Sequence, residues 1–321
     1  MSDTGKTAIS MNLVFVVSMA FCVVIGAWGL IDPGSMTGTM LGFTNYMLKS
    51  GSWAWLFICT CFLILSGYMA FGPYGHIRLG ADDEEPEFST PSWIAMLFAG
   101  GMGSGLLLWG PAEPMYHYIS PPGMEGGTAD AARQALVITN LHWGLHAWSI
   151  YAITALVIAY FTFRRGDKSM ISTPIRYLFP GKTGESVGKP ADILAVLSVV
   201  FGLAGSLAMG TLAVRSGSFY AFGTSETVGT SLTILAILFV CYMLSATTGV
   251  DKGIKILSNV NMVIAIAIML LVLFAGPTQF ILEAFIDSIG AYVSSIITMS
   301  FKLFPFEGLA GWSAGWTLTY L

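Results

Sequence analysis

The chain has few charged side chains. Asp, Glu, Lys and Arg make up 10% of its 321 residues and hydrophobic residues make up 55%, whereas a soluble domain carries about 25% charged residues. The mean hydropathy of +0.74 therefore excludes an ordinary soluble domain and indicates an integral membrane protein in a lipid bilayer. The net charge is only -4 and no basic tract occurs, so we expect no nucleic-acid partner.

Cysteine is also scarce, and its spacing excludes two common kinds of site. The four cysteines lie in apolar stretches, and Cys59 and Cys61 flank a single residue, which is neither a zinc nor a disulfide-scaffold spacing. We interpret all four as buried, unreactive thiols. The sequence shows no serine–histidine–acid arrangement and no phosphate loop, because no Lys-Ser/Thr follows its glycine cluster. These absences predict that the protein is not an enzyme and binds no organic cofactor.

Long apolar runs are what the sequence does contain. A helix needs about 20 apolar residues to cross a bilayer. The first run follows a short polar N-terminus and is long for a signal peptide, so we predict that it is the first membrane helix. An eighth span is expected to begin near residue 310. The other candidate spans are residues 11–32, 52–72, 92–110, 135–163, 191–214, 229–248 and 256–276.

Basic residues concentrate in alternate loops, which predicts the orientation of the spans. A cytoplasmic N-terminus puts most of the 14 Lys and Arg residues on the cytoplasmic side, as the positive-inside rule requires. The residues on that side are Lys6, Arg78, Arg164, Arg165, Lys168, Arg176, Lys182, Lys189, Lys252 and Lys255. The stretch 73–91 is acidic, and we predict a solvated cytoplasmic loop there.

Residues 279–301 have a different pattern. Apolar side chains recur at spacings of three and four, with Glu283, Asp287 and Ser294 between them. This pattern predicts an amphipathic helix that lies along a membrane surface or against neighbouring protein.

Four glycines interrupt the third apolar run between Gly100 and Gly105. Glycine weakens a helix, and lipid demands that every backbone polar group be satisfied within the protein. Two interpretations stay open on these residues alone. Unwound backbone can line a cavity and bind a ligand, as in transporters with broken helices, or small residues can let two helices pack closely.

The fourth run contains three aromatic residues, Trp143, Trp148 and Tyr151. At about 100° per residue, a continuous helix places Trp148 about 140° from Trp143, with Tyr151 between them. The three rings would then share one broad face. Such a face suits a quaternary ammonium, which has no hydrogen-bond donor and binds ring faces best. Ordinary lipid-facing or core aromatics explain the same residues equally well.

Two histidines in the same run have the spacing of a helical metal pair. His142 and His146 are four residues apart, but no carboxylate, cysteine or third histidine accompanies them in the run. We therefore favour buried, hydrogen-bonded histidines over a metal site.

Two further charged residues lie at the ends of apolar runs. Glu113 sits between Pro111 and Pro114, and this proline pair is predicted to end the third helix. Glu113 would cap, anchor or gate near the outer mouth, or be a plain interfacial carboxylate. Arg215 is predicted to snorkel to the interface.

Taken together, these segments resemble the betaine/carnitine/choline transporter family. The glycine-broken third run, the pair Glu113-Pro114 and the His-Trp, His-Ala-Trp and Tyr pattern of the fourth run occur in the family's order. Further segments that match are Asp192-Ile193-Leu194-Ala195 with Phe201-Gly202, Lys252-Gly253-Ile254-Lys255 with Leu257-Ser258-Asn259, and Gly315-Trp316-Thr317-Leu318-Thr319-Tyr320.

The resemblance implies an all-α, inverted-repeat secondary transporter in a bacterial-type plasma (inner) membrane. Two leading helices and the acidic loop would occupy residues 1–91, and the first five-helix repeat residues 92–276. A linking helix that takes part in homotrimer contacts would occupy 277–305, and the second repeat would start at 306–321.

The resemblance also implies a substrate and a site. The substrate class is a quaternary-ammonium solute such as glycine betaine, choline, carnitine or a sulfonium analogue, moved by alternating access. Trp143, Trp148 and Tyr151 match the family's aromatic box. Ala99 and Met102 match positions whose backbone carbonyls help bind sodium as a coupling ion. The unwound segment beside the substrate matches Gly101, Met102, Gly103, Ser104 and Gly105.

The chain departs from the family pattern in two respects. Val199 and Leu203 stand where sodium-coupled members have threonines, which argues against a second sodium site because an apolar side chain cannot ligate a hard cation. Asn261 stands about where exchangers carry an arginine. The remaining box tryptophans would follow Tyr320, so we expect a truncated second repeat. The alternative to a transporter is therefore a non-transporting membrane fragment with an incomplete substrate site.

Overall fold

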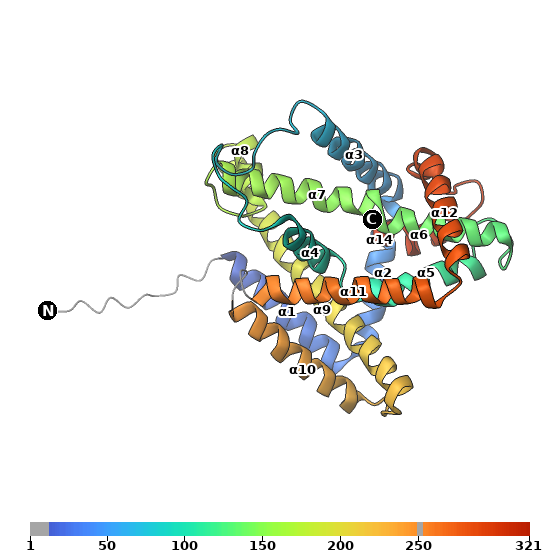
Figure 1. Cartoon of the computed structure of the whole chain (residues 1–321). Coiled ribbons are helices and arrows are strands. Elements are labelled where there is room, and N and C mark those ends of the chain that lie inside the picture. Colours follow the sequence, from blue (N-terminus) through green and yellow to red (C-terminus); the bar gives the residue numbers. More distant parts are fainter. Residues whose placement is uncertain (1–12, 249–252) are drawn as a thin grey trace. The chain divides into compact units, whose positions relative to one another are not determined.

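The computed structural model describes residues 13–248 and 253–321, apart from the side chain of Ser104. Lys6 and Lys252, two of the basic residues used to predict orientation, lie outside the described residues. The described chain is helical throughout its regular elements (Figure 1). It forms two compact units, one of residues 13–82, 149–202 and 314–319 and one of residues 83–148, 203–313 and 320–321.

The helices confirm an all-helical membrane protein with seven or eight candidate spans. Seven helical segments of the described chain are long and apolar enough to cross a bilayer, and a bent helix pair makes an eighth. The seven are Leu13–Ile31, Ser52–Phe71, Ala129–Arg164, Lys182–Phe222, Val228–Thr247, Lys255–Ala275 and Thr278–Met299. The last of these is the helix predicted to be amphipathic. The other six and the bent pair correspond to the seven predicted runs.

In the first unit, α1 (Leu13–Ile31), α2 (Pro33–Ser50) and α3 (Ser52–Phe71) pack in chain order. The sequence analysis missed α2, which is rich in glycine, threonine and methionine. Its start has a clear local cause: Pro33 occupies the first turn, and the Asp32 carboxylate accepts a hydrogen bond from the Ser35 amide at 2.9 Å.

Polar contacts hold two further segments of the first unit in place. α8 (Ser172–Leu178) is fixed by Asp192, whose buried carboxylate accepts from the Ser172 amide at 2.8 Å. The π-helical turn Tyr160–Arg164 ends in Arg164, which pairs with Asp82 at 2.7 Å. The predicted acidic loop is exposed, as expected, and Arg164 holds one point of it.

In the second unit, α4 (Thr90–Gly101) packs against α11 (Lys255–Ala275), and α6 (Ala129–Trp143) packs against both α5 (Ser104–Ile119) and α12 (Thr278–Met299). Figure 1 shows α12 in orange-red beside the green α6. Ile138, Leu141 and Met299 form the buried core between α6 and α12, with Tyr292 and Trp312 packed against it. The predicted helix at residues 279–301 is present, and of its two predicted placements, along a membrane surface or against neighbouring protein, the packing on α6 supports the second.

The remaining long helices are α7 (Leu145–Ala159), α9 (Lys182–Phe222) and α10 (Val228–Thr247), and two short helices, α13 (Ala310–Gly315) and α14 (Thr317–Tyr320), follow near residue 310. One expectation about the cysteines was wrong. All four are free thiols, but Cys61 and Cys241 are exposed on the protein surface, because apolar helix faces in a membrane protein can point outward into lipid.

Candidate functional site

The third span is broken at its glycines, as the sequence predicted. α4 ends at Gly101, α5 begins at Ser104, and the two axes are bent by 65°. Met102 and Gly103 adopt non-helical backbone angles between them. The Met102 amide still donates to the Phe98 carbonyl at 2.7 Å, and beyond it the helical hydrogen-bond ladder of α4 stops.

Tryptophan rings lie against glycines on both sides of the break, and the ring at Gly101 leaves no room for a side chain. A Cβ atom at Gly101 would lie 2.5 Å from Cη2 of Trp148, and one at Gly105 would lie 3.4 Å from Cη2 of Trp143. Gly100 and Gly103 meet nothing within 4 Å. The structure therefore shows both a broken helix and a close contact with an aromatic ring, and ligand binding by the unwound backbone stays a prediction.

The fourth span is also broken, which the sequence analysis missed. α6 ends at Trp143 and α7 begins at Leu145, with Gly144 in a non-helical conformation between them. The Tyr292 hydroxyl of α12 accepts a hydrogen bond from the Leu145 amide at 3.1 Å. A Cβ atom at Gly144 would lie 3.0 Å from that hydroxyl. The break is thus satisfied by a neighbouring helix, as lipid requires.

This second break corrects the projection that placed three aromatic rings on one helical face. The angle of 100° per residue does not apply between Trp143 and Trp148, because the helix is broken at Gly144. The evidence that the two rings lie near each other is instead their contacts with Gly105 and Gly101. Tyr151 lies three residues after Trp148 on the unbroken α7 and is exposed. It belongs to the other compact unit.

Glu113 is buried, which argues against a plain interfacial carboxylate, one of the alternatives left open for it. Its side chain has no solvent exposure, and its Oε1 lies 2.5 Å from Nδ1 of His142 and 3.3 Å from Nε2 of His117. Its Oε2 accepts a hydrogen bond from the Trp143 indole at 2.6 Å. A carboxylate, two imidazoles and an indole are thus joined in one buried cluster, which we call the Glu113 cluster.

The Glu113 cluster forms because α5 does not end at its prolines. Pro111 and Pro114 lie inside α5, which continues to Ile119. Proline is tolerated in membrane helices where neighbouring groups satisfy the freed backbone. The continued helix brings Glu113 and His117, four residues apart, onto one face. The sequence contained this spacing, but the prediction that the helix ended there concealed it.

Aromatic rings enclose the Glu113 cluster. Tyr320 stacks on His142 with ring centroids 4.9 Å apart and planes 6° from parallel, and it meets Trp143 edge-on at 5.3 Å. Trp312 lies 5.6 Å from His117. These rings restrict solvent and leave the polar atoms to contact one another.

The prediction that the histidines are buried and hydrogen-bonded is confirmed. His142 bonds Glu113, while His146 bonds the Ser300 hydroxyl at 2.9 Å. The break at Gly144 separates the two, so they do not act as a helical metal pair. The atoms that could share an ion belong instead to Glu113, His117 and His142, within 4.8 Å of one another.

Arg215 was predicted to snorkel to the membrane interface, but its guanidinium has partners within the protein. Its guanidinium donates to the Ser231 hydroxyl at 3.1 Å and lies 3.8 Å from Glu226. One turn earlier in α9, the Thr211 hydroxyl bonds the Leu207 carbonyl at 2.7 Å, a common arrangement for a hydroxyl within a helix.

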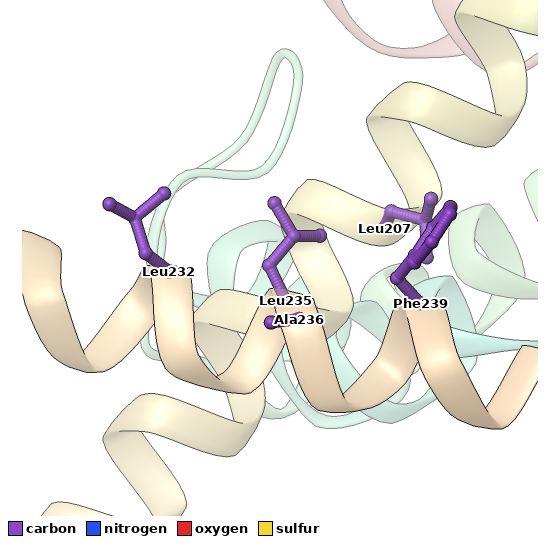
Figure 2. A pocket seen from close by; sticks show the side chains of 5 residues that line it. All are labelled: Leu207, Leu232, Leu235, Ala236 and Phe239. Atoms are coloured by element: carbon purple, nitrogen blue, oxygen red, sulfur yellow. The ribbon is translucent and has the colours of Figure 1, made fainter.

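A separate groove between α9 and α10 has no polar lining. Figure 2 shows the side chains of Leu207, Leu232, Leu235, Ala236 and Phe239 around it. It offers nothing to orient a zwitterion, and its chemistry suits an acyl chain. We therefore take the broken helices as the candidate site.

The positions matched to sodium ligands lie at the helix break. Ala99 is in the last turn of α4 and Met102 directly follows the helix. Carbonyls at the C-terminal end of a half-helix carry partial negative charge and are suited to a small cation. Val199, Leu203 and Asn261 are exposed on the protein surface.

Comparison with known proteins shows what the chain is similar to in sequence. The glycine betaine transporter OpuD of Bacillus subtilis is 41% identical over 309 residues, and the betaine/ectoine transporter LcoP of Corynebacterium glutamicum is 37% identical over 311. Each alignment covers 96% of this chain but 60% and 49%, respectively, of the relative. A glycine betaine transporter of Acinetobacter baylyi is 36% identical, and 46% of its length is covered. The model of the BCCT, betaine/carnitine/choline family transporters matches residues 13–321, and the chain therefore belongs to this family of multi-pass membrane transporters, which are not enzymes.

Proposed function

We propose that the protein takes part in secondary transport of quaternary-ammonium compatible solutes by alternating access. The substrates would be glycine betaine, choline, carnitine or a sulfonium analogue. The observation that carries the proposal is the placement of the Trp148 and Trp143 rings against Gly101 and Gly105 of the broken helix. The relatives named above transport betaine or ectoine, which supports this substrate class.

The aromatic residues supply the chemistry that such a substrate needs. A trimethylammonium group offers no hydrogen-bond donor, and indole faces attract it through the ring quadrupole. We assign Trp143, Trp148 and Tyr151 to this role. Trp148 and Tyr151 share a face of α7 because they are three residues apart in one helix.

The broken third span would contact both substrate and coupling ion. Backbone at Gly101, Met102, Gly103, Ser104 and Gly105 would lie beside the substrate, where missing side chains permit close approach. The carbonyls of Ala99 and Met102 would contribute to a sodium site. The five spans between Thr90 and Ala275 would form the first five-helix repeat of an inverted-repeat fold.

The first test is uptake. Cells that express the 321-residue chain would be given labelled glycine betaine and choline, with and without a sodium gradient, beside a membrane-insertion control. Sodium-dependent uptake would support transport and sodium coupling. A well-inserted chain that shows no uptake of either compound would contradict transport by this chain alone and favour a non-transporting fragment.

The site assignment has its own test in ligand binding. We expect Trp148→Ala to lower glycine betaine affinity at least tenfold while insertion stays normal, because the indole is the main contact for the cation. Trp53→Ala is the matched control, since Trp53 lies exposed in α3. Unchanged affinity in Trp148→Ala would overturn the aromatic-box assignment.

We further propose that the protein resides in a bacterial plasma (inner) membrane with a cytoplasmic N-terminus and assembles as a homotrimer through α12. The distribution of basic residues supports the orientation. Cysteine accessibility tests it at Lys168, on the predicted cytoplasmic side, and at Lys49, which the same spans place on the opposite side. Native mass spectrometry in lipid nanodiscs tests the trimer.

A further inference from the structure

We propose that Glu113, His117 and His142 form a buried binding site for one exchangeable proton, linked to Trp143 through the shared carboxylate. The site is built from α5 and α6, and all three side chains are at most 1% exposed. An ionised carboxylate at membrane depth is costly unless a partner compensates it. The imidazoles are the partners that this structure provides.

The geometry lets the cluster exist in two charge states. With both imidazoles neutral, their N–H groups can donate to Glu113 and the cluster carries one negative charge. One added proton neutralises the cluster without moving any group, because the contact between Glu113 Oε1 and His142 Nδ1 is already 2.5 Å. His117 Nε2 at 3.3 Å from the same oxygen is a second donor. The same hydrogen-bonded frame can thus hold the proton or release it.

Titratable side chains on the neighbouring elements that the structure describes have partners of their own. The nearest titratable neighbour is Tyr320, which stacks on His142. Asp287 of α12 forms an exposed ion pair with Arg133 of α6. Tyr292 of α12 bonds the Leu145 amide, and His146 of α7 bonds Ser300. Among the described residues, the other buried carboxylate is Asp192, in the first unit.

The second oxygen of Glu113 connects the proton to the proposed substrate site. Its Oε2 accepts the Trp143 indole N–H at 2.6 Å, and the same indole lies beside Gly105. Protonation removes the charge from this hydrogen bond and weakens its hold on the ring. If Trp143 binds substrate, as the proposed function requires, proton and substrate must then influence each other's affinity reciprocally.

A transition-metal ion is the competing occupant of the cluster. Two ligands on a tetrahedral zinc ion lie roughly 3.3 Å apart, given bonds of about 2.0–2.1 Å. Glu113 Oε1 and His142 Nδ1 lie closer together than two ligands of one zinc ion and are within hydrogen-bond distance. The geometry therefore favours the proton.

Histidine-selective NMR can test the proton site directly, because the chain contains only 4 histidines. The 321-residue chain, labelled with ¹⁵N-histidine and held in lipid nanodiscs, would be titrated with pH. We expect the His117 and His142 signals to change together at one midpoint. Glu113→Gln should abolish this common midpoint and leave His146 and His76 unchanged as internal controls. His117→Gln assigns the signals and serves as a second variant if Glu113→Gln fails to fold.

Three outcomes would overturn the proposal. The first is His117 and His142 signals that stay constant over the whole pH range of the folded state. The second is independent titration of the two, unaffected by Glu113→Gln. The third is stoichiometric replacement of the proton by added Zn²⁺ at low micromolar concentration, which would make the cluster a metal site.

Adding glycine betaine to the same titration tests the coupling through Trp143 separately from the proton site itself. A changed midpoint on addition of saturating betaine supports the link to Trp143, and an unchanged midpoint despite measured binding overturns it. A chain that titrates as expected but binds no betaine contradicts the proposed function and leaves the proton site standing.

Discussion

The α5–α6 region and the α9–α10 region are both apolar in sequence, yet they differ in what they bury. Glu113, His117 and His142 are enclosed in the first region. In the second, the most apolar window of each helix contains no buried residue, and its groove is lined by leucines, an alanine and a phenylalanine. In lipid, apolar side chains gain little from burial, because the solvent is as apolar as the protein.

This difference shows where sequence carries information in a membrane protein. Polar, small and aromatic residues in a span require partners, so they mark the protein interior and its sites. Leucine and valine satisfy either environment equally well. Substitutions in the two regions should therefore change stability by different amounts, and pairs of variants can test this.

The largest expected effect is at Glu113. Glu113→Ala leaves two buried imidazoles and an indole without their common acceptor, and each buried donor left unsatisfied costs about 1–3 kcal/mol. Leu232→Ala in the groove of α10 is the matched control, since Leu232 is 61% exposed and exposed substitutions stay within about 0.5 kcal/mol. Thermal unfolding in detergent measures both. Equal melting temperatures would remove the distinction between the regions.

The next effect compares two adjacent glycines of α4. A methyl group at Gly101 meets the Trp148 ring at 2.5 Å, while one at Gly100 meets nothing within 4 Å. We expect Gly101→Ala to cost about 1–3 kcal/mol through overpacking and to weaken betaine binding. Gly100→Ala should be neutral or stabilise by about 0.5–1 kcal/mol. Identical melting curves and affinities for the two variants would contradict the contact between Gly101 and Trp148.

A smaller effect is expected at the second helix break. Tyr292→Phe removes the hydroxyl that accepts the Leu145 amide, and a hydrogen bond contributes about 0.5–1.5 kcal/mol net. Tyr46→Phe is the control, because Tyr46 is 69% exposed. Chemical unfolding compares the two variants. A loss at Tyr46 as large as that at Tyr292 would mean that the break does not depend on the hydroxyl.

The sequence predicted the spans, the broken third helix and the buried histidines, because each depends on a local pattern. It failed at Gly144 and at the Pro111–Pro114 pair for the same reason. One glycine does not usually break a helix, but Tyr292 stabilises the break at Gly144. Two prolines usually end a helix, but in lipid neighbouring helices let α5 continue past Pro111 and Pro114.

The Glu113 cluster could not be predicted from span four alone, because its carboxylate comes from the preceding span. Only the continued helix puts Glu113 and His117 on one face. The spacing of four residues between them was the available signal, and it becomes readable once proline is allowed within a membrane helix.

The smallest effect lies outside both regions, in the acidic loop. Asp82 is fully exposed and pairs with Arg164 at 2.7 Å, and the guanidinium lowers the pKa of the Asp82 carboxyl. A lowered pKa means that the contact stabilises the loop at neutral pH, persists below the usual value of about 3.9, and is lost as pH falls through the lowered pKa. Asp82→Asn should reproduce the acid state at pH 7. We expect faster amide exchange in residues 79–85 with an unchanged melting temperature, since exposed ion pairs contribute little. Asp83→Asn removes the same charge without that contact, so equal acceleration in both variants would show that net loop charge, and not Arg164, orders this segment.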